Sequence, residues 1–101
     1  MAEPEIAIAD ATQSRRYEAR LGGDLAGVLE YRDVRGRRIL AHTEVLPAFE
    51  GRGIGGALAR FALEEARRLQ RRVSVKCPFV RSWLDRHHQY DDLIVELPER
   101  S

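Results

Sequence analysis

Four glycines within residues 51–56 constrain the fold of this chain more than any other feature of its sequence. They follow alternating polar and apolar residues over 38–45, which predict a strand. Apolar residues at three- and four-residue spacing come after them and predict an amphipathic helix from Ile54 to about Gln70. A strand that turns through glycines into a helix can hold phosphate, because the first helical turn has unpaired N–H groups and a partial positive charge.

Three interpretations of this glycine turn can be compared. A Walker A loop is excluded because no Gly-Lys-Ser/Thr follows. The Gly-x-Gly-x-x-Gly pattern of Gly51, Gly53 and Gly56 would suit a dinucleotide-binding fold, but only about 50 residues follow it and the preceding strand is not continuously apolar. The remaining alternative is that the glycines only shape a turn into the helix.

The rest of the chain predicts an α+β fold, in which antiparallel strands come first and a helix, a strand and a second helix follow. Alternating segments around Gly22-Gly23 predict a hairpin, and Gly36 marks a second turn. In the second helix we expect Phe79, Trp83 and Leu84 to be buried. The predicted elements are strands at 6–9, 15–21, 25–31 and 38–45, a helix at 54–70, a strand at 73–76, a helix at 79–87 and a closing strand-like segment at 90–97.

Composition narrows the class of protein. A chain of 101 residues that is 44% hydrophobic can form one compact domain over residues 1–101. Its net charge of +1 lacks the basic excess typical of a nucleic-acid partner. A single cysteine allows no internal disulfide, no apolar run approaches the ~20 residues of a membrane span, and residues 1–10 are not a signal peptide. We therefore expect a cytoplasmic protein with no membrane, nucleic-acid or metal partner.

Three motifs together resemble the minimal GNAT-like N-acetyltransferases, which are chains of about this size in the acetyl-CoA-dependent GNAT superfamily. The motifs are residues 41–45 (AHTEV), 50–56 (EGRGIGG) and 77–80 (CPFV), and the resemblance extends over about residues 17–90. It implies a GNAT-like acyl-CoA N-acyltransferase fold. In that fold a central mixed, mostly antiparallel sheet has two splayed strands that admit acetyl-CoA, and helices flank it.

The resemblance also implies how acetyl-CoA is held. The backbone of the strand ending at Val45 would bind the pantetheine arm, and the pyrophosphate would be cradled by Arg52, Gly53, Ile54, Gly55 and Gly56. Glu50 departs from the superfamily pattern, which usually has Gln or Arg there. Because a carboxylate beside a diphosphate is unfavourable, we expect Glu50 to turn away.

The candidate catalytic residues are Cys77, His42 and Glu44. His42 and Glu44 are two apart on a predicted strand, so they share a face and could act as a base and the group that orients it. The alternative is a polar outward face of the strand. The resemblance places Cys77 near the acetyl thioester, where a thiolate could accept the acyl group, although a free cysteine is often only a small buried residue.

We expect the strand before Cys77 to splay away from the strand of His42, leaving the thiol at the mouth of the cleft. Many larger GNAT enzymes have a general-acid tyrosine on the following helix, whereas this chain has Trp83, which cannot donate a proton in that role.

The predicted function is an acetyl-CoA-dependent transfer of an acetyl group to an unidentified amine acceptor, either directly or through Cys77, without a metal. The alternative is a non-catalytic acyl-CoA-binding module, because so short a chain lacks the elements with which larger relatives bind an acceptor. An RNA-binding protein is disfavoured by the charge balance.

Overall fold

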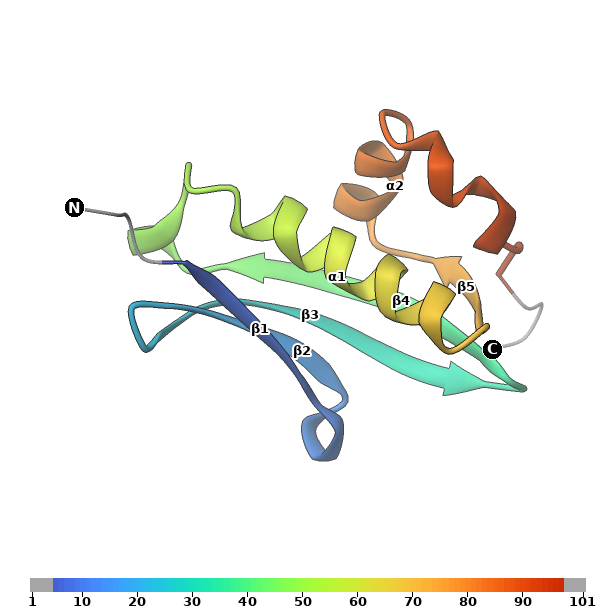
Figure 1. Cartoon of the computed structure of the whole chain (residues 1–101), viewed down its shortest axis with the longest axis horizontal. Coiled ribbons are helices and arrows are strands. Elements are labelled where there is room, and N and C mark those ends of the chain that lie inside the picture. The colour runs from blue at the N-terminus through green and yellow to red at the C-terminus, as the bar shows by residue number, and fades with distance from the viewer. Residues whose placement is uncertain (1–4, 98–101) are drawn as a thin grey trace.

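The computed structural model describes residues 5–97, and five strands form one sheet in the order β1-β2-β3-β4-β5. Neighbouring strands are antiparallel except for β4 and β5, which run parallel. The sheet is therefore mixed and mostly antiparallel, as predicted (Figure 1). The strands are β1 (Ile6–Ala11), β2 (Arg16–Leu21), β3 (Asp24–Val34), β4 (Arg37–Val45) and β5 (Arg72–Val75).

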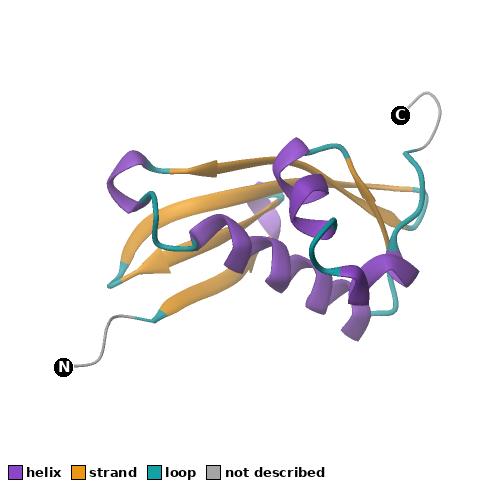
Figure 2. Ribbon diagram, turned by 90° about the horizontal axis from the view of Figure 1, so that it is seen from above, coloured by secondary structure: helices purple, strands orange, loops and turns teal. Residues whose placement is uncertain are grey.

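Two α-helices, α1 (Ile54–Arg68) and α2 (Pro78–Leu84), pack on the same side of this sheet (Figures 1 and 2). The stripe of α1 that faces the sheet is apolar and includes Ile54, Leu58, Ala62 and Leu63, which are at most 2% exposed. Burial of this stripe from water is the main force that fixes α1 on the sheet. Three short 3₁₀ helices complete the described elements: η1 (Thr12–Ser14), η2 (Pro47–Phe49) and η3 (His88–Leu93).

The segment at 90–97 was predicted to be strand-like, and this prediction is wrong. Its first half, residues 90–93, belongs to η3, and of the remaining residues only Ile94 forms an isolated bridge, with Val73. The segment is held instead by individual hydrogen bonds, because the Ser74 hydroxyl lies 2.9 Å from the carbonyl oxygen of Val95 and 3.0 Å from that of Glu96. The single proton of this buried hydroxyl is shared between the two carbonyl oxygens, and this contact replaces part of a strand ladder.

The second helix is shorter than the predicted 79–87, and one of its expected core residues is not buried. Val80, Trp83 and Leu84 form the buried side of α2, whereas Phe79 is 42% exposed. The spacing of Phe79 and Trp83 suits a shared face, but the stripe that meets the core begins one residue later, at Val80. Phe79 therefore lies at the margin of the helix contact.

Candidate active site

The strands β4 and β5 separate partway along β4. Their parallel ladder pairs Arg37–Leu40 with Arg72–Val75 and goes no further. At its end, the N–H groups of Lys76 and Cys77 both donate to the carbonyl oxygen of Leu40, at 2.9 and 3.1 Å. Pro78 follows with no N–H to donate and begins α2, so the chain leaves the sheet. The predicted splay therefore begins at Leu40, and residues 41–45 extend β4 beyond it.

A bulge in β4 sets the direction of its side chains beyond this point. Tyr31 pairs with Leu40 and the adjacent Glu30 pairs with His42, so Ala41 is an extra residue in the β3–β4 ladder. Leu40 is buried in the core that includes α1, whereas His42 is exposed. His42 and Glu44 thus lie on the face of the sheet opposite α1, here called the open face, and Thr43 lies on the helix side.

His42 and Glu44 are brought together as predicted. The Nε2 atom of His42 lies 3.6 Å from Oε1 of Glu44, and the two side chains are 58% and 63% exposed. Glu30, the register partner of His42, is also exposed. The pair is therefore accessible to a molecule that approaches the open face, beside the point where β4 and β5 separate.

Cys77 is not at the mouth of the cleft, so that expectation is wrong. Its side chain is 2% exposed and lies on the helix side of the sheet, where Sγ is 3.2 Å from Oγ1 of Thr43. His42 points to the opposite face of β4, so Thr43 and not His42 is the neighbour of the thiol. Sequence reasoning missed Thr43, although its position between His42 and Glu44 already places it on the other face of the strand.

The glycine turn starts α1 in the way its sequence predicts. Gly53 is the N-cap, with φ of 77°, and Gly51 has φ of 79°; both lie in the left-handed region that favours glycine. No side chain caps the helix, and the N–H of Ala57 makes the first intrahelical hydrogen bond, to the carbonyl of Gly53 at 3.0 Å. The N–H groups of the turn before it lack helical partners and are suited to an anion.

A cavity of about 260 Å³ lies over this turn. Its apolar walls come from Val45, Phe49 and Phe79, and the remaining lining residues are Glu50, Gly51, Gly53, Ile54, Gly55 and Gly56. Every predicted cofactor-binding residue except Arg52 therefore borders it. A larger cavity of about 500 Å³ lies between α2, η3 and residues 94–97, but none of the predicted site residues lines it.

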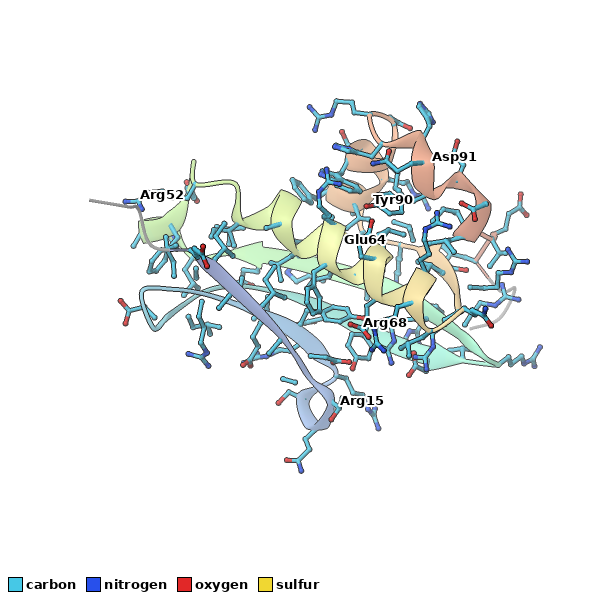
Figure 3. All side chains as sticks on the ribbon, viewed as in Figure 1. Arg15, Arg52, Glu64, Arg68, Tyr90 and Asp91 are labelled. Atoms are coloured by element: carbon cyan, nitrogen blue, oxygen red, sulfur yellow. The ribbon has the colours of Figure 1, made fainter. Side chains whose placement is uncertain are left out.

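The two charged residues of the motif differ in their position relative to this cavity. Glu50 is exposed and belongs to the lining of the cavity, and the expectation that its carboxylate turns away stays a prediction. Arg52 lies at the N-terminal end of α1 (Figure 3). Its side chain is exposed, and it does not belong to the lining of the cavity. The backbone between them takes left-handed conformations at Gly51 and Gly53, so the direction of neighbouring side chains depends on the folded turn.

The tyrosine nearest to α2 in the sequence does not take the place of a general acid. Tyr90 is 1% exposed, and its hydroxyl hydrogen-bonds to the carboxylate of Glu64 and lies 3.3 Å from Arg60, both on α1 (Figure 3). Burial, together with the hydrogen bond to Glu64, raises the pKa of Tyr90 above its ordinary value. This hydroxyl stabilises the packing of η3 on α1, and the two aromatic residues of α2 beside the glycine turn, Phe79 and Trp83, have no acidic proton for that role.

The fold and this site define the class of the protein. A mixed sheet whose parallel pair separates beside a glycine-started helix is the GNAT arrangement. Residues 16–93 match the family of GCN5-related N-acetyl-transferases, and the chain belongs to this family. No curated protein sequence gives a significant match.

Solved structures of low sequence identity share the fold. A GCN5-like protein from Staphylococcus aureus, solved by NMR, is 22% identical, with a TM-score of 0.66 over 99% of this chain and 96% of its own. A ribosomal-protein-alanine N-acetyltransferase from Brucella melitensis is also 22% identical, with a TM-score of 0.55. That match covers 85% of this chain and 64% of the Brucella chain.

Two searches of the described residues bear on partners. Between residues 5 and 97, no three or more His, Cys, Asp or Glu side chains are grouped so that they could hold a metal ion. None of the helices in that range combines the length and apolar character that crossing a bilayer requires.

Proposed function

We propose that this chain is an N-acetyltransferase that transfers the acetyl group of acetyl-CoA to an amine. The observation that carries the proposal is the separation of β4 from β5 at Leu40, directly beside the uncapped first turn of α1. The first turn of α1 offers unpaired N–H groups for a diphosphate. The part of β4 beyond Leu40 offers free strand backbone for an amide-containing arm. Family membership supports the same cosubstrate.

The residues suited to acetyl-CoA lie along one path. The N–H groups at Gly53, Ile54, Gly55 and Gly56 are suited to the pyrophosphate, and Arg52 adds a positive charge at the same end of α1. The backbone of β4 up to Val45 is suited to the pantetheine arm, because its β5 side is without a ladder partner beyond Leu40 in the described structure. Bound there, acetyl-CoA would supply an activated acyl group.

Direct transfer is the route that the side chains favour. The nitrogen of a neutral amine attacks the thioester carbon, the new N–C bond forms, the C–S bond breaks, and coenzyme A leaves as the thiolate. His42 takes the proton lost by the nitrogen, directly or through water, and Glu44, 3.6 Å away, orients the imidazole. Both side chains are exposed on the open face, so the amine would approach from that face.

The route through Cys77 is a second candidate, supported by the position of the residue where β5 ends. It requires the thiol to become accessible, because only an ionised thiol in contact with the thioester attacks it. With Cys77 2% exposed and beside Thr43, this route needs a rearrangement that direct transfer does not. The non-catalytic binding module remains an alternative, since it would bind acyl-CoA at the same glycine turn and the same part of β4 without using His42.

The test is release of coenzyme A thiol from acetyl-CoA in the presence of a panel of primary amines, combined with mass spectrometry of the intact protein. Direct transfer predicts thiol release and acetylated amine without acetylated protein. Calorimetric binding of acetyl-CoA without thiol release for any amine would favour the binding module. Acetylated protein that forms before the product would favour Cys77.

A further inference from the structure

Phe79 is unusual among the large apolar side chains of the core-facing segments. It is 42% exposed, although Val80 and Trp83 on the same helix are 0% and 5% exposed. Exposure of an aromatic ring forgoes much of the stabilisation that its burial would provide. Packing of α2 on α1 is therefore achieved by Trp83 and its neighbours, and Phe79 is available for another contact.

The ring of Phe79 stands directly over the glycine turn. A Cβ atom placed on Gly55 would be 2.7 Å from Cζ of Phe79, closer than real Cβ atoms approach, and 3.0 Å from Cε2, so the ring would have to shift. Since Cα–Cβ bonds in a helix tilt toward its N-terminus, the ring lies in front of the first turn of α1. The position of the Phe79 ring is thus a reason for glycine at residue 55, and this reason does not depend on phosphate binding.

The same ring closes one side of the cavity described above. Phe79 lines it together with Val45 at the end of β4 and Phe49 in η2, while the glycine backbone forms its polar part. A molecule that reaches both the N–H groups of α1 and the free part of β4 must pass this ring. An apolar ring interacts poorly with a diphosphate, so its suitable partner is the apolar stretch of the arm next to the diphosphate, which in coenzyme A is the dimethyl group of the pantoate.

We propose that Phe79 is a cofactor-positioning residue, whose ring packs on the dimethyl-bearing part of the pantetheine arm and retains coenzyme A in the cleft. This inference rests on the proposed function. Its consequence is kinetic: removal of the ring should speed dissociation of the arm more than it slows association. Phe79 acts by contact with the arm and takes no part in proton transfer.

The test compares Phe79→Ala with the parent protein and with Leu69→Ala. Leu69 is a matched control, because it is 46% exposed and follows the opposite end of α1. The probes are coenzyme A and ADP, which has the diphosphate but no arm. Trp83, the only tryptophan, lies within 3.3 Å of a Cβ placed on Gly56, so stopped-flow tryptophan fluorescence can follow binding.

We expect Phe79→Ala to weaken coenzyme A binding by about tenfold, mainly through a faster dissociation rate, as is usual for a lost contact. ADP affinity and the thermal unfolding midpoint should stay unchanged, Leu69→Ala should bind coenzyme A like the parent, and Phe79→Leu should recover part of the loss. Unchanged coenzyme A dissociation in a folded Phe79→Ala protein would overturn the inference. An equal loss for ADP and coenzyme A would also overturn it, because the ring would then act on the diphosphate end.

A second variant separates the effect of the Phe79 ring on binding from the effect of the glycine turn. Gly55→Ala should push the ring aside and weaken coenzyme A binding in the parent, but it should have no further effect in Phe79→Ala, where the space is empty. Equal losses in both backgrounds would mean that Gly55 serves the phosphate and not the ring, which contradicts the inference. A parent protein that binds no coenzyme A would overturn the proposed function as well, whereas normal parent binding with an unaffected Phe79→Ala overturns the inference alone.

Discussion

The Oγ1 atom of Thr43 lies 3.2 Å from the Sγ atom of Cys77, so a side-chain contact joins β4 to the start of α2 beyond Leu40, the last residue of β4 that is hydrogen-bonded to the backbone of this segment. The contact keeps the thiol on the helix side of the sheet, and His42 and Glu44 lie on the open face. The two groups of candidate catalytic residues are thus on opposite faces of one strand. An acceptor on the open face meets His42 first, which is the physical reason to favour direct transfer.

This relationship predicts that Cys77→Ala remains active. Direct transfer does not use the thiol, so we expect kcat within about threefold of the parent, a change of less than ~1 kcal/mol in the activation barrier. Loss of the buried sulfur should lower the free energy of unfolding by about 1 kcal/mol. Steady-state thiol release and urea unfolding measure these effects. If the variant binds acetyl-CoA normally but transfers nothing, the covalent route is the correct one.

His42→Ala should lose activity without losing the cosubstrate. Removal of a general base typically costs about 10²- to 10⁴-fold in rate. The imidazole lies on the open face, opposite the side of the sheet that carries the glycine turn, so its removal should not affect binding of acetyl-CoA. Turnover and calorimetric affinity, measured on the same preparation, separate the two effects. His88→Ala is the control, since His88 is exposed and its Nδ1 lies 3.1 Å from Oδ2 of Asp91, outside this site. Comparable rates for parent and His42→Ala would remove His42 from the mechanism.

Arg52→Ala should weaken coenzyme A binding moderately and leave thermal stability unchanged. Because Arg52 is exposed, we expect a loss of about three- to tenfold at low salt, which becomes smaller as salt screens the contact. Arg86→Ala, an exposed arginine that follows α2, controls for the general effect of charge. An affinity that does not depend on Arg52 at any salt concentration would leave it as an ordinary surface residue.

Glu50→Gln should strengthen coenzyme A binding, because Glu50 belongs to the lining of the cavity proposed for the cofactor. Removal of a like charge near a diphosphate should raise affinity by about two- to fivefold at low salt, and less at high salt. Calorimetry over a salt series measures this. A weaker affinity for Glu50→Gln would show that Glu50 helps to shape the turn, contrary to the electrostatic argument.

Asp33→Asn should lower stability at neutral pH but not at acidic pH. Arg38, which is 8% exposed and stacked 3.7 Å from the centroid of Tyr31, donates to both carboxylate oxygens of Asp33 at 2.8 and 2.9 Å. These hydrogen bonds lower the pKa of Asp33, so the unfolded chain binds its proton more readily than the folded one. The stabilisation is therefore complete above the ordinary aspartate pKa and is lost as the pH falls through the lowered value.

Because the Asp33 side chain is half exposed, solvent screening limits the effect to about 0.5–1 kcal/mol at pH 7. Urea unfolding of parent and Asp33→Asn at pH 7 and at about pH 3 measures the difference, with Asp24→Asn, an exposed residue at the start of β3, as a control. If parent and Asp33→Asn differ in stability by the same amount at both pH values, the hydrogen bonds between Asp33 and Arg38 stabilise the protein, and the charge of Asp33 does not.

Much of the architecture could be predicted because it depends on local properties of the chain. Alternation around Gly22-Gly23 predicts the hairpin of β2 and β3, and the spacing of Ile54 and Leu58 predicts the buried side of α1. Gly53 predicts the start of that helix, since a left-handed N-cap is a property of one residue. His42 and Glu44 share a face because a strand alternates with a period of two.

Contacts between segments distant in the sequence decided the rest. The burial of Cys77 depends on Thr43, 34 residues away, and the exposure of Phe79 depends on which residue of α2 first meets the core. The bulge at Ala41, which directs His42 to the open face, exists only in the pairing of β4 with β3. Sequence alone thus determined most of the strands, the helix α1, the family motifs and the phosphate-suited turn. Tertiary packing decided which side chains reach the cleft, because burial is a property of the assembled layers.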